Sequence, residues 1–210
     1  KIEILVTVMK KSDINPQPEI LANLPIMHFP RQTDWKLWLK KNHAAVAGVW
    51  LRIAKQSSGN PSVSYKEALD VALCYGWIDG QKQKDSEHTW LQRFTPRGKK
   101  SIWSKINREK AMALVKSGQM QPAGLQEMER AKSDGRWEAA YDSSRTSTIP
   151  PDLQDAFDNN AHAHSFFKTL DSANRYAVLF RIQTAKKAET RARKIQQFIE
   201  MLERKEKIHP

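Results

Sequence analysis

Strand-type and helix-type hydrophobic patterns occupy different parts of this chain, and this separation constrains the fold most. Alternating apolar residues typical of half-buried strands occur at 49–54, 77–79 and 89–94. From Ser104 onward the apolar spacing is helical throughout. The sequence therefore predicts an α+β fold, predominantly helical, in which a small antiparallel sheet is flanked by helices and followed by a C-terminal helical subdomain.

The distribution of prolines and polar residues divides the chain into four segments. Residues 1–30 combine a β-like run at 4–8 with four prolines, which predicts an extended N-terminal arm. Residues 31–142 form the predicted main α+β domain. The polar stretch 143–151 (SSRTSTIPP) is the predicted linker. Residues 152–207 then form a predicted C-terminal helical domain.

Short local signals set the ends of the predicted helices. Ser64 and Glu67 form a capping box, in which each satisfies a free backbone donor, and Gly76 is a C-cap candidate for the helix that they begin. The last helix carries one apolar stripe of Ile195, Phe198, Ile199 and Leu202. The other predicted helices lie at 35–43, 104–117, 122–132, 137–141, 152–159, 162–170 and 172–185.

The charge balance favours anionic partners. Lys and Arg outnumber Asp and Glu by 35 to 23, giving a formal net charge of +12. Cys74 is the single cysteine, which excludes an intrachain disulfide and suits a reducing compartment. The apolar run 2–9 makes a poor signal peptide, and no stretch approaches the roughly 20 apolar residues that span a bilayer. We therefore expect a cytoplasmic protein without a transmembrane segment.

The segment 75–81 is the first candidate for a ligand site. It places Tyr75, Trp77, Asp79 and Gln81 around two glycines, which allow close approach of a ligand to the backbone. Asp79 and Gln81 would then bind a ligand at a pocket rim, with Trp77 as its apolar wall. The alternative interpretation makes Trp77 a core residue and Asp79 a turn residue.

The second candidate is a basic and aromatic stretch. Between residues 80 and 110 there are nine Lys or Arg and three Asp or Glu, so that the local excess is half of the net charge of the chain. Arginine side chains and a helix N-terminus at Ser104 both suit a phosphate or carboxylate, although a solvated basic loop is the alternative. The candidate ligand residues here are Arg93, Thr95, Arg97, Trp103, Ser104, Lys105 and Asn107.

No signature of a metal site, cofactor site or known catalytic centre stands in the sequence. His162 and His164 are two residues apart on a predicted helix and point to nearly opposite faces, so they cannot share a metal. Glycine-rich phosphate loops, nucleophile elbows and HExxH motifs do not occur. We therefore expect neither a metal nor a cofactor, and catalytic residues stay unassigned.

Several motifs together resemble the YdeI/OmpD-associated (bacteriocin-protection) family after about residue 28. They are Trp35–Leu39, Gly48–Leu51, Tyr65–Ala68, Cys74–Gly80, Arg93–Arg97, Ser101–Asn107, Asp134–Trp137, Ala140–Asp142, Arg175–Tyr176, Ala185–Lys187 and Glu189–Arg191. The resemblance implies that residues 152–207 are a helical domain of the OmpD-associated type. It also implies a stress-protection or antimicrobial-peptide-protection protein, and it implies no catalytic residues.

Four functional hypotheses remain at this point. The leading one is binding of an anionic small molecule in a cleft, with Arg93, Arg97 and Lys105 facing the charge and Trp77 or Trp103 the apolar part. The second is an enzyme that acts on a phosphorylated or carboxylated small molecule, with Asp79 as acid or base. The third is nonspecific nucleic-acid binding, which no recognised motif supports, and the fourth is attachment to an anionic membrane surface.

Overall fold

A computed structural model describes residues 19–210, and the predicted β-like run at 4–8 lies outside the described residues. The described chain forms two compact units. Among the described residues, one unit contains 19–69 together with 78–96, and the other contains 70–77 and 97–210. Each unit therefore combines separate stretches of sequence.

A five-stranded sheet with the order β1-β2-β3-β5-β4 is the centre of the first unit. Its strands are β1 (Ile20–Leu21), β2 (Leu24–His28), β3 (Val49–Ala54), β4 (Trp77–Lys84) and β5 (Thr89–Pro96). β1 is antiparallel to β2, β2 is parallel to β3, and β3 is antiparallel to β5, with Val49 opposite Phe94. The sheet is therefore mixed.

The predicted fold class is wrong in two respects. The prediction of an antiparallel sheet fails because β2, which lies in the proline-rich segment expected to be an arm, pairs in parallel with β3. Parallel neighbours need a crossover connection, and here the helix α1 (Gln32–Asn42) provides it. The structure is 48% helical and 16% strand, so that an α+β fold is consistent but "predominantly helical" overstates the helix content.

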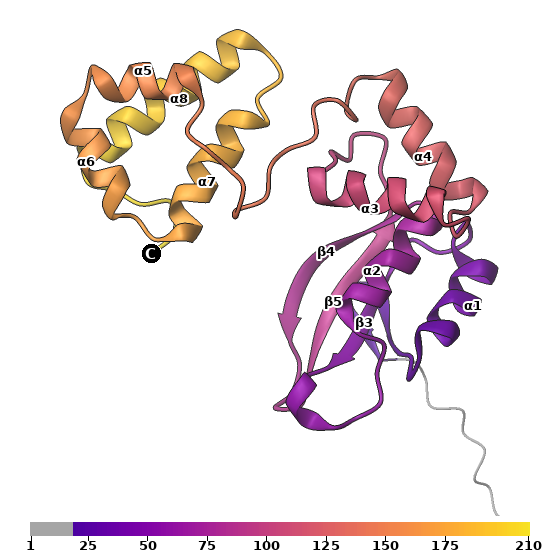
Figure 1. The fold of residues 1–210 in the computed structure, drawn as a ribbon. Helices are drawn as coiled ribbons and strands as arrows, with labels where there is room; N and C mark the ends of the chain where they lie inside the picture. Colours follow the sequence, from indigo (N-terminus) through magenta and orange to yellow (C-terminus); the bar gives the residue numbers. More distant parts are fainter. Residues whose placement is uncertain (1–18) are drawn as a thin grey trace, which may run out of the picture. The chain divides into compact units, whose positions relative to one another are not determined.

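Helix α1 and helix α2 (Tyr65–Cys74) lie on the same face of the sheet (Figure 1). Trp35 of α1 is fully buried, its ring centroid lies 5.8 Å from that of Phe94, and its Nε1 donates to the Ala68 carbonyl at 3.1 Å. The predicted capping box is confirmed: Glu67 accepts from the Ser64 backbone amide at 2.9 Å, and Ser64 Oγ accepts from the Glu67 amide at 3.3 Å.

In the second unit, α3 (Lys105–Lys116) and α4 (Pro122–Ser133) match predicted helices. The prediction of a short helix at 137–141 is wrong. The chain forms turns up to residue 139, and Tyr141 makes a parallel β-bridge with Ser104. Gly135, with a φ of +76°, directs the backbone away from helical geometry immediately after α4.

The last four helices are α5 (Pro151–Asp158), α6 (Ala161–Thr169), α7 (Ser172–Gln183) and α8 (Ala188–Glu203). They enclose a core that includes Leu153, Phe157, Val178 and Ile182. The predicted stripe of α8 is confirmed, since Ile195, Ile199 and Leu202 are buried and Phe198 packs against this core while remaining partly exposed. Within residues 19–210, no helix has the length and apolar character needed to cross a membrane.

Candidate functional site

The predicted ligand residues divide between the two units. Asp79, Gln81, Arg93 and Thr95 belong to the first unit. Tyr75, Trp77, Arg97, Trp103, Ser104, Lys105 and Asn107 belong to the second unit. The second unit therefore contains most of the predicted site residues.

Arg97 and Trp103 form a buried stacked pair. The guanidinium carbon of Arg97 lies 3.6 Å from the centroid of the Trp103 ring, and the residues are 5% and 2% exposed. Arg97 also donates from Nη1 to the Ile102 carbonyl at 3.3 Å, while its backbone amide donates to Gly76 at 2.9 Å. Such desolvated cation–π contacts stabilise by about 2 kcal/mol. The predicted basic and aromatic residues thus contact each other in the interior.

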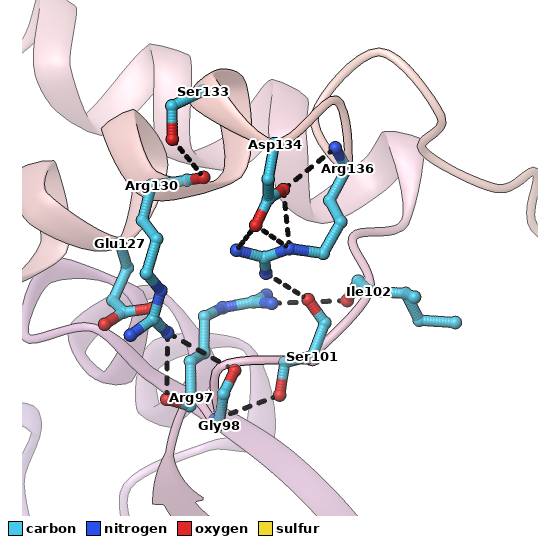
Figure 2. Close-up of polar contacts among 9 residues, drawn as sticks. All are labelled: Arg97, Gly98, Ser101, Ile102, Glu127, Arg130, Ser133, Asp134 and Arg136. Atoms are coloured by element: carbon cyan, nitrogen blue, oxygen red, sulfur yellow. Dashed lines mark hydrogen bonds and ion pairs between the residues drawn. The ribbon is translucent and has the colours of Figure 1, made fainter.

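Two arginines of α4 and the following turn complete a cluster with Arg97 (Figure 2). We define the arginine cluster as Arg97, Arg130 and Arg136 with the carboxylates Glu127 and Asp134. Arg130 pairs with Glu127 and donates to the carbonyls of Arg97 and Gly98, both at 3.3 Å. The cluster therefore contains three cations and two carboxylates. The hydrogen bonds from Arg130 link helix α4 to the segment 97–98.

Arg136 is the most constrained member of the arginine cluster. Its Nε donates to both carboxylate oxygens of Asp134 at 2.8 Å, and its Nη1 donates to the Ser101 carbonyl at 2.6 Å. The hydrogen bond from Arg136 is the largest cause that lowers the pKa of Asp134. A bidentate pair of this kind fixes the plane of the guanidinium group. Arg136 is only 5% exposed, and its partners hold the guanidinium group in one orientation.

Burial and charge act in opposite directions on Glu127. Its pKa is raised mainly because burial penalises the charged carboxylate, and Arg130, Arg97 and Arg136 oppose that rise. For the pKa of Glu127, the effect of burial is thus larger than the opposing effect of the three arginines.

A cavity of about 310 Å³ opens beside Arg136. Its lining comes from the 102 region, the turn after α4, and the end of α7: Ile102, Asp134, Gly135, Arg136, Ala139, Tyr141, Gln183, Thr184, Ala185 and Lys186. Arg136 and Lys186 supply positive charge, Asp134 supplies one negative charge, and Ile102 and Tyr141 supply apolar surface. We call this space the Arg136 cavity.

The other predicted residues of this unit have structural partners. Lys105 forms an ion pair with Asp142 at 2.7 Å, and Ser104 caps α3 by accepting from the Asn107 amide at 3.1 Å. Tyr75 and Trp77 are buried, and burial is the main cause that raises the pKa of the Tyr75 hydroxyl. Ser104 thus begins a helix as predicted, and its hydroxyl is occupied in capping that helix.

In the first unit, Asp79 is half-buried and accepts from the Tyr65 hydroxyl at 2.8 Å. Gln81 is exposed on β4, whereas Arg93 and Thr95 are half-buried on β5. A Cβ atom added at Gly80 would lie 3.8 Å from the Arg93 side chain, so that Gly80 and Arg93 are neighbours.

Sequence reasoning missed Glu127, Arg130, Asp134 and Arg136 as parts of a site. The signal was weak, because α4 looks like an ordinary charged helix and Asp134–Trp137 stood out only within the family resemblance. Charges brought together by tertiary packing leave no spacing rule in the sequence. Within residues 19–210, no group of three or more His, Cys, Asp or Glu is arranged to hold a metal ion.

The chain is thus a basic α+β protein whose last four helices share one hydrophobic core. Residues 146–205 match the family described as "Bacteriocin-protection, YdeI or OmpD-Associated", so the resemblance is confirmed for this C-terminal segment. Residues 27–127 match a "Domain of unknown function (DUF8412)". Searches of curated proteins and of solved structures gave no match.

Proposed function

We propose that this chain is a stress-protection protein of the bacteriocin-protection type that binds a small anionic ligand in the Arg136 cavity. The C-terminal helices support the protection role, because residues 146–205 match the bacteriocin-protection family. The net charge of +12 favours an anionic ligand over a cationic one. The observation that carries the proposal is that one cavity is lined both by a fixed arginine, Arg136, and by an exposed lysine, Lys186.

Arg136 and Lys186 would have complementary roles in this cavity. Asp134 and the Ser101 carbonyl hold Arg136 before any ligand arrives, and such preorganisation lowers the entropic cost of binding. Lys186 is exposed and forms no ion pair with any residue in the range 19–210. Its ammonium group is therefore available to an anion.

Tyr141 and Ile102 would contact the uncharged part of the ligand. The Tyr141 ring meets Phe180 edge-on, with centroids 4.9 Å apart, and this contact fixes one wall of the cavity. A volume of about 310 Å³ lies at the lower end of the range of about 300–1,000 Å³ typical of small-molecule sites. The proposed ligand is thus a compact phosphorylated or carboxylated molecule. Arg97 would act through its hydrogen bond to Ile102 and would not contact the ligand itself.

The test is a thermal-shift titration with nucleotides, sugar phosphates, cell-wall precursors and short RNA and DNA at low and moderate salt. We expect one class of small anion to raise the melting temperature, since a ligand that binds only the folded state stabilises it. Lys186→Gln should weaken that binding about tenfold, the loss expected for one charged hydrogen bond of about 1.5 kcal/mol.

Lys187→Gln is the matched control, because Lys187 is the exposed neighbour of Lys186 and does not line the cavity. Equal weakening by both variants would indicate diffuse attraction and would contradict the proposal. Stabilisation by polynucleotides alone, removed by moderate salt, would favour nonspecific nucleic-acid binding instead.

A further inference from the structure

A second cavity, of about 470 Å³, lies within the C-terminal helices and shares no lining residue with the Arg136 cavity. Its walls come from the segment before α5, the end of α6, and the first half of α7: Ser144, Ser147, Thr148, Ile149, Phe167, Lys168, Ser172, Arg175, Tyr176 and Leu179. We call it the Arg175 cavity.

The Arg175 cavity is lined by positive charge without a carboxylate. Lys168 and Arg175 are both exposed, and neither forms an ion pair with another residue of 19–210. By contrast, Arg191 pairs with Asp152 at 2.6 Å and Arg204 pairs with Glu206 at 3.0 Å. The nearest carboxylate in sequence is Asp171, and it is occupied as the cap of α7, accepting from the Asn174 amide at 2.7 Å. The two cations are therefore uncompensated at the cavity.

Hydroxyl groups and apolar side chains share the rest of the lining. Four hydroxyls, from Ser144, Ser147, Thr148 and Ser172, can donate to or accept from a polar ligand. Phe167 and Leu179 are buried core residues that supply an apolar surface. Tyr176 is fixed because its hydroxyl donates to the Asp142 carbonyl at 2.9 Å.

We propose that the Arg175 cavity is a binding site for a small phosphomonoester that also carries hydroxyl groups, such as a sugar phosphate or a nucleoside monophosphate. Arg175 binds the phosphate with its planar fork of donors, and Lys168 adds a second positive charge. The serine and threonine hydroxyls bind the hydroxyl groups of the ligand, and the sugar or base packs against Phe167 and Leu179. This site does not depend on the function proposed for the Arg136 cavity.

The test is calorimetric titration of the full chain with ribose 5-phosphate and adenosine monophosphate, and with ribose and adenosine as uncharged counterparts. We expect the phosphorylated probes to bind and the uncharged ones to bind at least about tenfold more weakly, because a charged pair to the phosphate is lost. Arg175→Gln and Lys168→Gln should each weaken binding about tenfold. Both positions are exposed, so thermal unfolding should report intact folding of the variants.

Two controls isolate this cavity from the rest of the molecule. Arg181→Gln removes an exposed cation of the same helix that does not line the cavity, and Lys186→Gln removes the lysine of the Arg136 cavity. Arg181→Gln should leave binding of the phosphorylated probes unchanged, and Lys186→Gln should leave unchanged the binding that Arg175→Gln and Lys168→Gln weaken. Binding that survives Arg175→Gln and Lys168→Gln would overturn the proposal, as would equal affinity for ribose, or stronger binding of a carboxylate analogue such as ribonate. Loss of binding in Lys186→Gln alone would assign the ligand to the Arg136 cavity.

Discussion

At the scale of single residues, basic side chains with similar sequence surroundings have different roles in the structure. Arg97 and Lys105 both stand in the stretch predicted to bind an anion. Arg97 is buried against Trp103, and Lys105 pairs with Asp142. Lys186, which lies outside that stretch, is an exposed cation that lines the Arg136 cavity. Burial and partners in the fold therefore decide the role of each charge: Lys186 is exposed and has no ion pair within residues 19–210, whereas Arg97 is buried and Lys105 is paired.

The first prediction concerns Arg97. Replacing it in Arg97→Lys keeps the charge but removes the planar group that stacks on Trp103 and donates to Ile102. We expect the free energy of unfolding to fall by about 2–4 kcal/mol, since a buried ammonium gains no equivalent partner. Chemical denaturation measures this change.

Lys100→Gln is the control for Arg97→Lys, because Lys100 is exposed in the same loop. A change within about 0.5 kcal/mol is expected there. If Arg97→Lys were as stable as the original protein but bound anions less well, Arg97 would be a ligand residue and its structural role would be refuted.

At the scale of elements, tertiary contacts overrode some local signals and left others intact. The alternating pattern of β3 and the capping box of α2 predicted these elements well, because the causes lie within a few residues. Strand β2 was missed because it lies in a proline-containing segment typical of an extended arm, and its pairing partner β3 lies beyond an intervening helix. The turn at 134–139 replaced a predicted helix, since Asp134 binds the Arg136 amide at 3.2 Å.

The second prediction concerns the packing of α4 against the end of α2. Gly124 is buried in α4, and a Cβ atom there would lie 2.7 Å from the Leu73 carbonyl oxygen and would also meet the Cys74 carbonyl. Gly124→Ala should therefore lower the free energy of unfolding by about 1–3 kcal/mol, despite the better helix propensity of alanine. Thermal unfolding of the variant tests this expectation.

Gly98→Ala provides the comparison for Gly124→Ala. A Cβ atom at Gly98 would meet Ser101 Oγ at 3.7 Å, an ordinary contact distance. A stability close to that of the original protein is expected. If Gly124→Ala were the more stable of the two variants, close packing of α4 would not be the reason for a glycine at this position.

At the scale of the whole molecule, the C-terminal helices have a core of their own. Buried residues from Leu153 to Leu202 form one hydrophobic cluster, and its partly buried neighbours extend from Ile149 to Ile208. The family match covers nearly the same residues, 146–205. The predicted linker at 143–151 thus remains a testable boundary.

The third prediction follows from this core. A fragment comprising residues 143–210 should fold by itself and unfold cooperatively on heating, because its apolar side chains bury one another. Phe157→Ala, at a side chain only 1% exposed, should destabilise the fragment by about 3–5 kcal/mol. Circular dichroism of the fragment measures both effects. A fragment without a cooperative transition would place the domain boundary elsewhere.

The sequence by itself determined the features whose causes are local: most helix positions, strand β3, the caps at Ser64 and Ser104, the apolar stripe of α8 and the family of the C-terminal helices. Only the tertiary structure decided the parallel pairing of β2, the arginine cluster and the two cavities. The physical reason is the distance along the sequence over which each kind of interaction acts. Periodicity and capping act over a few residues, whereas strand partners, and groups such as the Arg136 guanidinium and the Ser101 carbonyl, meet only when distant segments pack together.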